Sequence, residues 1–280
     1  MAGSVLITGG TGFLARGLVK RLLENGCERI CVYSRGEYAQ ATMRAQFDND
    51  ARLRWFIGDV RDQQRLELAM ERVAAVIHAA ALKRIEVGAR QPGEMVKTNV
   101  VGSQNVIEAA RRAGVAKCLL ISSDKAFEPV SPYGQTKALA ESLFLTANDI
   151  YPHGPRFAVV RYGNVWNSTG SIVPTWKGLI AAGAIAVPVT NPDCTRFFMR
   201  LDEAVTLVLG TLAVMRGGEI EVPTLPAYRV ADLAAAFDMP MQVDEMPKWE
   251  KQNESMADGL RSDQARRMSV DELRAELAGV

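Results

Sequence analysis

A tyrosine and a lysine, Tyr133 and Lys137, form a pair whose types and spacing suit acid–base chemistry. Residues four apart share one face of a helix, so these two side chains would lie side by side there. A free phenol, with a pKa of about 10, is a poor base at neutral pH. A neighbouring ammonium stabilises the phenolate, so Tyr133 is a candidate general base and Lys137 its partner. A chance spacing on an exposed helix is the alternative.

A glycine-rich stretch at residues 8–15 could bind a phosphate group, because it follows a strand-like run and opens an amphipathic helix. Gly9 would permit a tight turn, and Gly12 would let a pyrophosphate approach the free N–H groups of the helix start. Ala15 is small enough for helix and strand to pack closely. This pattern predicts a dinucleotide site, and an ordinary glycine-rich turn is the alternative.

The end of the second strand indicates which dinucleotide binds. Ser34 and Arg35 stand where an NAD site usually has an acidic residue, and an arginine fork suits the 2′-phosphate of NADP. A solvated surface arginine is the alternative. His78 is expected to be structural. The residues predicted to bind the cofactor are Thr8, Gly9, Gly12, Phe13, Leu14, Ser34, Arg35, Asp59, Val60, Ala79, Ala80, Ala81, Lys83, Tyr133, Lys137, Tyr162 and Asn164.

Short apolar runs alternate with helical stretches, which is typical of βαβ units. We predict an α/β fold with a Rossmann-like, doubly wound parallel sheet and a smaller carboxy-terminal part that binds the substrate. Residues 1–162 would bind NADP and 163–280 mainly the substrate, with about 200–216 packing back on the first part. The predicted strands are 5–8, 30–33, 54–57, 75–78, 117–122 and 157–161. Helices are expected after Asp62, from Asp202 to about Met215, and after a capping box of Ser269 and Glu272.

The composition excludes several classes of protein. The 33 basic and 32 acidic residues nearly cancel, so nothing favours binding to nucleic acid or to an anionic membrane. No apolar stretch approaches the roughly 20 residues that span a bilayer, and no leader is apparent, so we predict a cytoplasmic protein. The four cysteines form no C-x-x-C pair and are expected to be reduced and mostly buried; no metal site is predicted. A homo-oligomer is expected.

Several motifs resemble one known family. The stretches that carry the resemblance are 33–37, 58–62, 78–83, 97–99, 122–126, 133–137, 161–165, 170–174 and 195–198. In order along the chain they are similar to the UDP-N-acetylglucosamine 4,6-dehydratases of bacterial surface-glycan biosynthesis, which begin the route to pseudaminic acid. Those enzymes are extended short-chain dehydrogenases/reductases. The resemblance covers about the first 225 residues. Tyr133 matches the C5-inverting branch, whereas the membrane-anchored retaining branch tends to carry methionine there.

The resemblance implies a cycle with no net redox change. Tyr133 would take the C4 hydroxyl proton as hydride passes to NADP⁺, and Lys125, in its neutral form with a lowered pKa, would remove the C5 proton. Asp124, with a raised pKa, would help the C6 hydroxyl to leave as water before the hydride returns to C6. A surface ion pair is the alternative for Asp124 and Lys125. The predicted substrate-binding residues, for a nucleotide sugar such as UDP-N-acetylglucosamine, are Lys83, Asn99, Asn164, Ser171, Val173, Arg196 and Glu254.

The resemblance weakens near the carboxyl end. The family usually has Arg-Pro-Gly-Glu-Lys-x-His-Glu there, whereas residues 247–254 keep the Glu-Lys pair and Glu254 but lack the arginine, glycine and histidine. This puts the sugar or nucleotide specificity in doubt. For Arg196, an ion pair with a carboxylate is the alternative to a diphosphate contact. Two other functions stay open: another redox enzyme of nucleotide sugars, such as an epimerase or reductase, and a non-catalytic NADP(H)-binding module.

Overall fold

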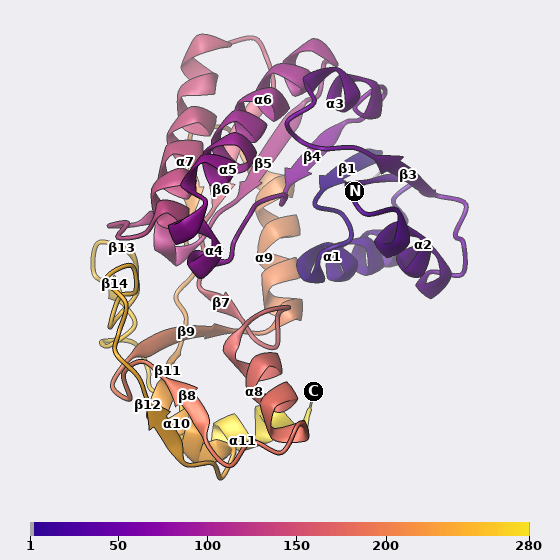
Figure 1. The fold of residues 1–280 in the computed structure, drawn as a ribbon. Helices are drawn as coiled ribbons and strands as arrows, with labels where there is room; N and C mark the ends of the chain where they lie inside the picture. Colours follow the sequence, from indigo (N-terminus) through magenta and orange to yellow (C-terminus); the bar gives the residue numbers. More distant parts are fainter. Residues whose placement is uncertain (1–2, 280) are drawn as a thin grey trace.

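A seven-stranded parallel sheet forms the centre of the larger part of the molecule (Figure 1). The structure is a computed structural model, and it describes residues 3–279. The strand order is β10-β6-β5-β4-β1-β2-β3. The bounds of these strands are β1 (Ser4–Thr8), β2 (Arg29–Ser34), β3 (Leu53–Ile57), β4 (Ala75–His78), β5 (Lys117–Ile121), β6 (Arg156–Val160) and β10 (Ile220–Glu221). The predicted fold, a doubly wound parallel sheet, is confirmed.

Six of the seven strands are those predicted from the sequence, with ends that differ by at most one residue. The seventh, β10, was not predicted. It contains only two residues, which pair in parallel with Val159 and Val160 of β6. Two residues are too few to show an alternation of apolar and polar side chains, so this strand is detectable only through its neighbour.

Helices cover both faces of the sheet. One face packs against α1 (Phe13–Glu24), α2 (Glu37–Gln46) and α9 (Leu201–Val214), and the other against α3 (Gln63–Ala69), α6 (Gly102–Arg112) and α7 (Pro132–Ile150). Leu18 and Leu22 of α1 are fully buried on the first face, and Phe144 of α7 on the second. Burying each such side chain contributes about 1.5–3 kcal/mol, so the two cores hold the helices that carry the site.

The capping residues at the amino ends of two helices agree with the sequence prediction. Asp62 caps α3 by accepting a hydrogen bond from the Arg65 N–H at 3.0 Å, as predicted. Ser269 and Glu272 form the predicted capping box of α11 (Val270–Ala278). Helix α9 begins at Leu201, one residue before the predicted start at Asp202, and its N-cap is Arg200. The Arg200 N–H donates to Glu203, a local contact that outweighed the capping preference of aspartate.

Between β4 and α6 the chain is irregular. It forms α4 (Ile85–Arg90), α5 (Pro92–Met95) and a π-helical turn, η1 (Val96–Val101), which runs directly into α6. A single 3₁₀ turn, η2 (Asp124–Ala126), follows β5. Turns of the π type often lie at functional sites, and both irregular segments follow carboxyl ends of central strands.

The smaller part contains three small sheets and three helices (Figure 1). Its core includes Trp176 and Val173. The sheets are formed by β11 (Ala227–Arg229), β9 (Thr195–Met199) and β7 (Asn164–Val165), by β12 (Met241–Val243) and β8 (Val187–Val189), and by β13 (Ser255–Ala257) and β14 (Leu260–Arg261); the helices are α8 (Ile172–Ala181), α10 (Val230–Ala236) and α11. Helix α9 packs against α1 of the larger part. We propose a division near residue 162, after which the chain leaves the large sheet.

Within residues 3–279, no helix combines the length and the apolar composition that crossing a membrane requires.

Cys27, Cys31, Cys118 and Cys194 are free and buried, as predicted. Burial raises the pKa of Cys31, Cys118 and Cys194, so these thiols stay protonated at neutral pH.

Candidate active site

The predicted site residues converge because the carboxyl ends of the parallel strands meet at one edge of the sheet. Thr8 at the end of β1 stands opposite both Tyr33 on β2 and His78 on β4. Ile121 at the end of β5 stands opposite Val160 on β6. The loops that follow these strands therefore emerge side by side, which is where open α/β sheets bind their ligands.

The loop after β1 has the geometry of a phosphate-binding turn. Gly9 has φ of +65°, and a Cβ there would lie 2.9 Å from the Cα of Ala80. Gly12 begins α1, and no side chain caps its first turn, where Phe13 and Leu14 lie partly buried. Helix N–H groups without a capping side chain, together with the helix dipole, favour an anion. Ala15 is 1% exposed, as the predicted close packing requires.

Thr8 lies behind this loop and is fully buried. Its hydroxyl lies 2.7 Å from His78 Nδ1 and accepts a hydrogen bond from the Ala80 N–H at 3.2 Å. His78 Nε2 contacts Ser103, whose hydroxyl donates to a backbone carbonyl, so His78 donates from Nε2 and accepts at Nδ1. The Thr8 hydroxyl joins the loops after β1 and β4, and the contact of Thr8 with the cofactor stays a prediction. His78 is the structural histidine that the sequence predicted.

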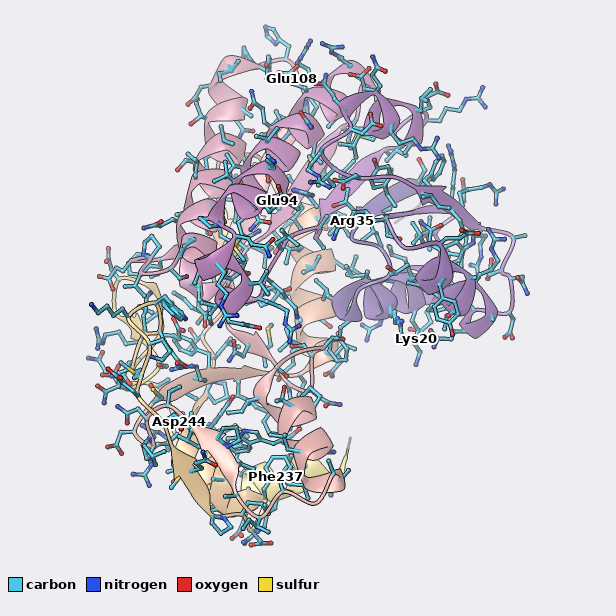
Figure 2. All side chains as sticks on the ribbon, viewed as in Figure 1. Lys20, Arg35, Glu94, Glu108, Phe237 and Asp244 are labelled. Atoms are coloured by element: carbon cyan, nitrogen blue, oxygen red, sulfur yellow. The ribbon has the colours of Figure 1, made fainter. Side chains whose placement is uncertain are left out.

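The end of β2 presents Arg35 to solvent (Figure 2), while Ser34 is buried beneath it. The Gln40 amide donates to the Ser34 hydroxyl at 3.0 Å. Arg35 lies 3.8 Å from the Asp59 carboxylate, which is bound more closely by Arg61 at 2.7 Å. Burial opposes the negative charge of Asp59, but Arg61 and Arg35 outweigh it and hold its pKa below the ordinary value. Among residues 3–279, Arg35 is thus an exposed cation with only one loose partner.

The loop after β4 carries the three partly buried alanines Ala79, Ala80 and Ala81, followed by the exposed Lys83. Asn99, predicted to bind substrate, is 2% exposed and engages both ends of its amide. Its oxygen accepts from the Leu82 N–H at 2.8 Å, and its nitrogen donates to the Leu82 carbonyl and the Thr136 hydroxyl. The observed contacts of Asn99 therefore fix the loop that carries Lys83. Val60, which was predicted to bind the cofactor, is buried against Gly102.

The turn after β5 carries Asp124 and Lys125. Ser123 caps it, accepting from the Lys125 N–H at 3.2 Å and donating to Asp124 at 2.7 Å. The Asp124 N–H donates to the Tyr162 carbonyl, which joins this turn to the end of β6. Asp124 is fully buried, and its second carboxylate oxygen, Oδ2, has no hydrogen-bond partner in the described part of the chain. The predicted alternative, a surface ion pair, is wrong because both partners are largely buried.

Helix α7 brings Tyr133 to this turn. Ser131 caps the helix by accepting from the Gly134 N–H at 3.1 Å, and Pro132 occupies its first turn. A Cβ at Gly134 would overlap the Lys125 carbonyl oxygen, so only glycine allows this approach. No role was predicted for Gly134 from the sequence. Its position between Tyr133 and Lys137 could have drawn attention to it, but the local sequence does not show which backbone segment it contacts.

The electrostatics of Tyr133 differ from the prediction. Burial raises the pKa of its phenol, while the positive charge of Lys125 and the Ser123 hydroxyl oppose that shift. Lys137 is 4% exposed and donates to the Ile121 carbonyl at 2.6 Å. Burial lowers the pKa of Lys137 to about 8, which weakens the ammonium effect expected of it. Lys125 is therefore the cation that most favours a phenolate at Tyr133.

Lys125 sits between two carboxylates. Its Nζ lies 3.1 Å from Asp124 and 3.2 Å from Glu254. Burial alone would lower the pKa of Lys125, but these two negative charges outweigh it and hold the pKa above its ordinary value. The predicted lowered pKa is thus wrong, because the sequence could not show that Glu254 joins the pair. Burial raises the pKa of Asp124, against the effect of Lys125, as its predicted role as an acid requires.

Arg196, predicted to contact a diphosphate, instead pairs with a carboxylate. Its guanidinium lies 2.6 Å from Glu250 and also donates to the carbonyls of Thr195 and Gln252. The ion pair that the sequence left as an alternative is therefore present. Arg196 is 7% exposed, and its contacts attach the carboxy-terminal segment to β9.

Three other residues predicted to bind substrate line one small cavity in the smaller part: Asn164, Ser171 and Val173. Val173 is fully buried, whereas the Ser171 hydroxyl is buried without a hydrogen-bond partner among residues 3–279. Tyr228 on β11 lines the same cavity and was missed by the sequence analysis. It is 2% exposed, and nothing in its local sequence separates it from an ordinary core tyrosine.

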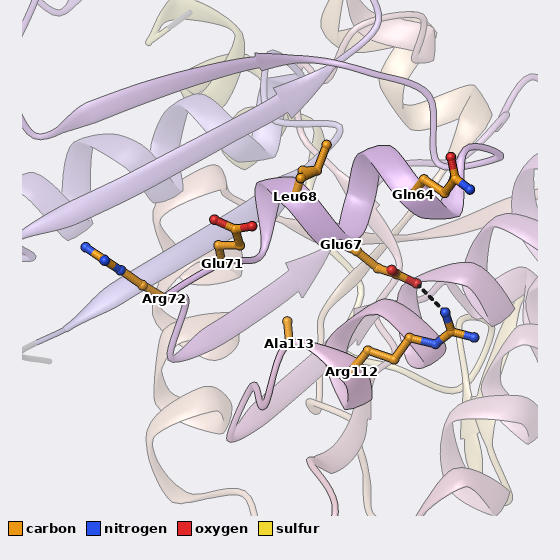
Figure 3. A pocket seen from close by; sticks show the side chains of 7 residues that line it. All are labelled: Gln64, Glu67, Leu68, Glu71, Arg72, Arg112 and Ala113. Atoms are coloured by element: carbon orange, nitrogen blue, oxygen red, sulfur yellow. Dashed lines mark ion pairs between the residues drawn. The ribbon is translucent and has the colours of Figure 1, made fainter.

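A second hollow (Figure 3) is lined by Gln64, Glu67, Leu68, Glu71, Arg72, Arg112 and Ala113. It is an open groove beside α3 and the end of α6, and Glu67 and Arg112 form an ion pair of 3.2 Å across it. Arg72 and Ala113 precede β4 and β5, so the groove lies at the amino ends of the strands. Ligand sites of open α/β sheets lie at the opposite edge.

The chain matches the polysaccharide biosynthesis protein family over residues 5–264. It belongs to that family. It is 46% identical over 236 residues to the inverting UDP-N-acetylglucosamine 4,6-dehydratase of Campylobacter jejuni subsp. jejuni serotype O:23/36, an alignment that covers 84% of this chain and 70% of the relative. The resemblance seen in the motifs is confirmed.

Solved structures of other proteins share the fold. Pen from Bacillus thuringiensis superposes with a TM-score of 0.94 at 29% identity, covering 99% of this chain and 98% of the other. DesIV, a dTDP-glucose 4,6-dehydratase from Streptomyces venezuelae solved with NAD and TYD bound, gives 0.86 at 21% identity, with 98% and 96% covered. At that identity the second likeness establishes the fold alone.

Proposed function

We propose that this protein is a nucleotide-sugar 4,6-dehydratase that acts on UDP-N-acetylglucosamine and gives a 4-keto-6-deoxy sugar with inverted C5. The observation that carries the proposal is the buried contact of Asp124 and Lys125, 3.1 Å apart, beside Tyr133. An epimerase or reductase of the same fold needs a tyrosine and a lysine but has no use for this second pair. The identity to the inverting dehydratase of Campylobacter jejuni supports the same substrate.

The chain's own residues would hold and move three protons. A bound nicotinamide would accept hydride from C4 and return it to C6. Tyr133 would take the C4 hydroxyl proton, helped by the positive charge of Lys125. The resulting ketone acidifies the neighbouring C5–H, which then needs a base, while the C6 hydroxyl needs an acid.

One internal proton transfer would prepare the second pair. If the Lys125 ammonium gives its proton to Asp124 across their 3.1 Å contact, Lys125 becomes a neutral amine and Asp124 a neutral acid. Lys125 could then remove the C5 proton, and Asp124 could donate to the C6 oxygen from its unpartnered Oδ2. Burial disfavours separated charges, so it lowers the cost of this neutralisation. A positioned acid or base typically contributes about 10²–10⁴-fold to the rate.

The cofactor we propose is NADP. The glycine turn without a capping side chain at the start of α1 suits the pyrophosphate, and the exposed Arg35 suits a 2′-phosphate. Asp59 and the alanines after β4 lie at the same edge. Lys137 would bind the nicotinamide ribose with its amino group, which already points to the end of β5.

The nucleotide sugar would lie between this edge and the smaller part. Lys83 is exposed, and Asn164 and Ser171 line the small cavity beside β7, so these three remain our candidates for substrate contacts. Arg196 and Glu254 would act through neighbouring side chains, given their ion pairs. A homo-oligomer stays a prediction.

The test is incubation with UDP-N-acetylglucosamine and a panel of other nucleotide sugars, followed by mass spectrometry. We expect loss of one water from UDP-N-acetylglucosamine with no net consumption of NADP⁺. Deuterium placed at C4 should appear at C6. NADPH that accumulates in proportion to product would identify a simple dehydrogenase, and a product of unchanged mass with inverted C4 would identify an epimerase.

A further inference from the structure

The carboxy-terminal segment 250–257 packs onto the turn that carries the acid–base pair. Lys251 donates to the Phe127 carbonyl at 2.6 Å, directly after that turn. Arg161 donates to the Met256 carbonyl at 2.6 Å and is itself paired with Glu141 of α7. The segment is thus attached to both the catalytic turn and the catalytic helix.

Glu254 is the residue of this segment that reaches the pair. Its backbone is fixed on both sides, because its N–H donates to the Ser262 hydroxyl at 2.8 Å and its carbonyl accepts from the Ser262 N–H at 2.9 Å. The side chain is 2% exposed, and Oε1 lies 3.2 Å from Lys125. Its other oxygen, Oε2, has no hydrogen-bond partner in the described chain. A buried, rigidly held carboxylate beside a buried ammonium acts at short range with little screening by solvent.

We infer that Glu254 is a positioning residue for the Asp124–Lys125 pair: its buried carboxylate holds the Lys125 ammonium against Asp124 and keeps the proton shared by that pair bound at neutral pH. This inference rests on the proposed function for its role in the reaction. It differs from the substrate contact predicted for Glu254 from the sequence, because the carboxylate faces the lysine that carries out the chemistry.

The positive charges around Glu254 keep it ionised, and its own negative charge favours protonation of Asp124 and Lys125. Burial would raise its pKa, but the positive charges of Lys125, Arg196 and Lys251 outweigh burial and keep Glu254 ionised. Its negative charge in turn raises the pKa of both Asp124 and Lys125. The titratable or charged groups that face this cluster are Asp124, Lys125, Tyr133, Cys194, Arg196, Tyr228, Glu250 and Lys251, with Glu128 acting on Lys251.

Removing the charge of Glu254 should shift the pH dependence of kcat in one direction. Dehydration requires the pair to keep one transferable proton, so activity falls on the alkaline side when that proton is lost. Glu254→Gln removes a negative charge that favours the bound proton. The alkaline limb of the kcat profile should therefore move to lower pH, by about one unit or more, as expected for a charge within about 4–6 Å.

Two further variants separate charge from packing. Glu254→Asp keeps the charge and should retain the wild-type alkaline limb, even where kcat is reduced. Glu245→Gln removes a carboxylate of the same type from an exposed position earlier in the sequence and should leave the profile unchanged. An alkaline limb that is the same in Glu254→Gln and wild type would overturn the inference.

A second measurement needs no turnover. Reductive methylation of Lys125 with formaldehyde and a borane, followed by peptide mass spectrometry across a pH series, reports the neutral amine directly. We expect half-modification at lower pH in Glu254→Gln than in wild type, Glu254→Asp and Glu245→Gln; equal midpoints would contradict the inference. A wild type that dehydrates no nucleotide sugar would instead contradict the proposed function, and the labelling midpoints would still decide the role of Glu254.

Discussion

The loop after β1 and the turn after β5 lie at the same edge of one sheet but are built differently. The first depends on the backbone: Gly9 turns with positive φ against Ala80, and α1 begins without a capping side chain. The second depends on charges from distant segments, since Lys125 meets both its neighbour Asp124 and Glu254, far along the chain. A backbone site is encoded locally, whereas a charge cluster requires the whole fold.

The comparison predicts that removing a single charge in the second region has a large chemical effect. Lys125→Ala should still allow C4 to be oxidised, at a reduced rate because Tyr133 loses the cation that favours its phenolate, and should lower dehydration by about 10²–10⁴-fold. A single turnover should show bound NADPH absorbance with little product, and in heavy water the exchange of the C5 proton should be lost. Tyr133→Phe should stop earlier, with no NADPH signal.

The exposed Lys20 on α1 provides the matched control (Figure 2), and Lys20→Ala should behave like wild type. Dehydration by Lys125→Ala at close to the wild-type rate would place the C5 base elsewhere and leave the Asp124–Lys125 pair a structural role.

Gly134 lies beside the charged turn after β5, but it acts through the backbone and not through a charge. Gly134→Ala forces a Cβ onto the Lys125 carbonyl, so we expect a loss of about 1–3 kcal/mol in the free energy of unfolding together with loss of dehydration. Urea unfolding and the water-loss assay measure the two effects. Gly210 in α9 meets nothing within 4 Å, so Gly210→Ala should be neutral or stabilise by up to about 1 kcal/mol. Equal stability of the two variants would be evidence against the close approach.

His78, at the junction of the loops after β1 and β4, should make the free energy of unfolding depend on pH. Burial lowers the pKa of His78 to about 3, from 6.5. Below pH 6.5 the unfolded chain binds a proton that the folded protein does not, so stability falls as the pH drops towards 3, by up to about 1.4 kcal/mol per unit. We expect about 2 kcal/mol of this loss by pH 5, measured by urea unfolding. His78→Asn should show a shallower slope and the exposed His153→Gln the wild-type one; equal slopes in wild type and His78→Asn would refute the assignment.

The smallest expected effect concerns Arg35, an exposed charge at the end of β2. Arg35→Asp should reverse or erase the preference for NADP(H) over NAD(H), by at least about tenfold in Kd, because the 2′-phosphate would lose its cationic partner. Binding titrations with both cofactors measure it, with Arg72→Asp as a remote surface control. Equal affinity of the wild type for the two cofactors would remove the role of Arg35.

The sequence alone predicted most of the larger part. The β1 turn, the Asp62 cap and six strands of the sheet follow from glycine placement, capping residues and apolar periodicity, all of which act within a few residues. Tyr133 and Lys137 could be predicted to lie side by side because residues four apart share one face of a helix. Motif resemblance identified Asp124 and Lys125 as a pair and the family to which the chain belongs.

Only the tertiary structure decided the protonation states and the supporting contacts. Gly134 meets the Lys125 carbonyl, Glu254 reaches the Lys125 ammonium, and Arg196 binds Glu250 instead of standing free. None of these contacts has a local sequence signal, because each joins segments that meet only after the sheet and the smaller part have folded. A pKa depends on every charge within a few ångströms and on burial, and both are properties of the folded chain. The sequence therefore determined which groups are present, and the fold determined which of them hold a proton.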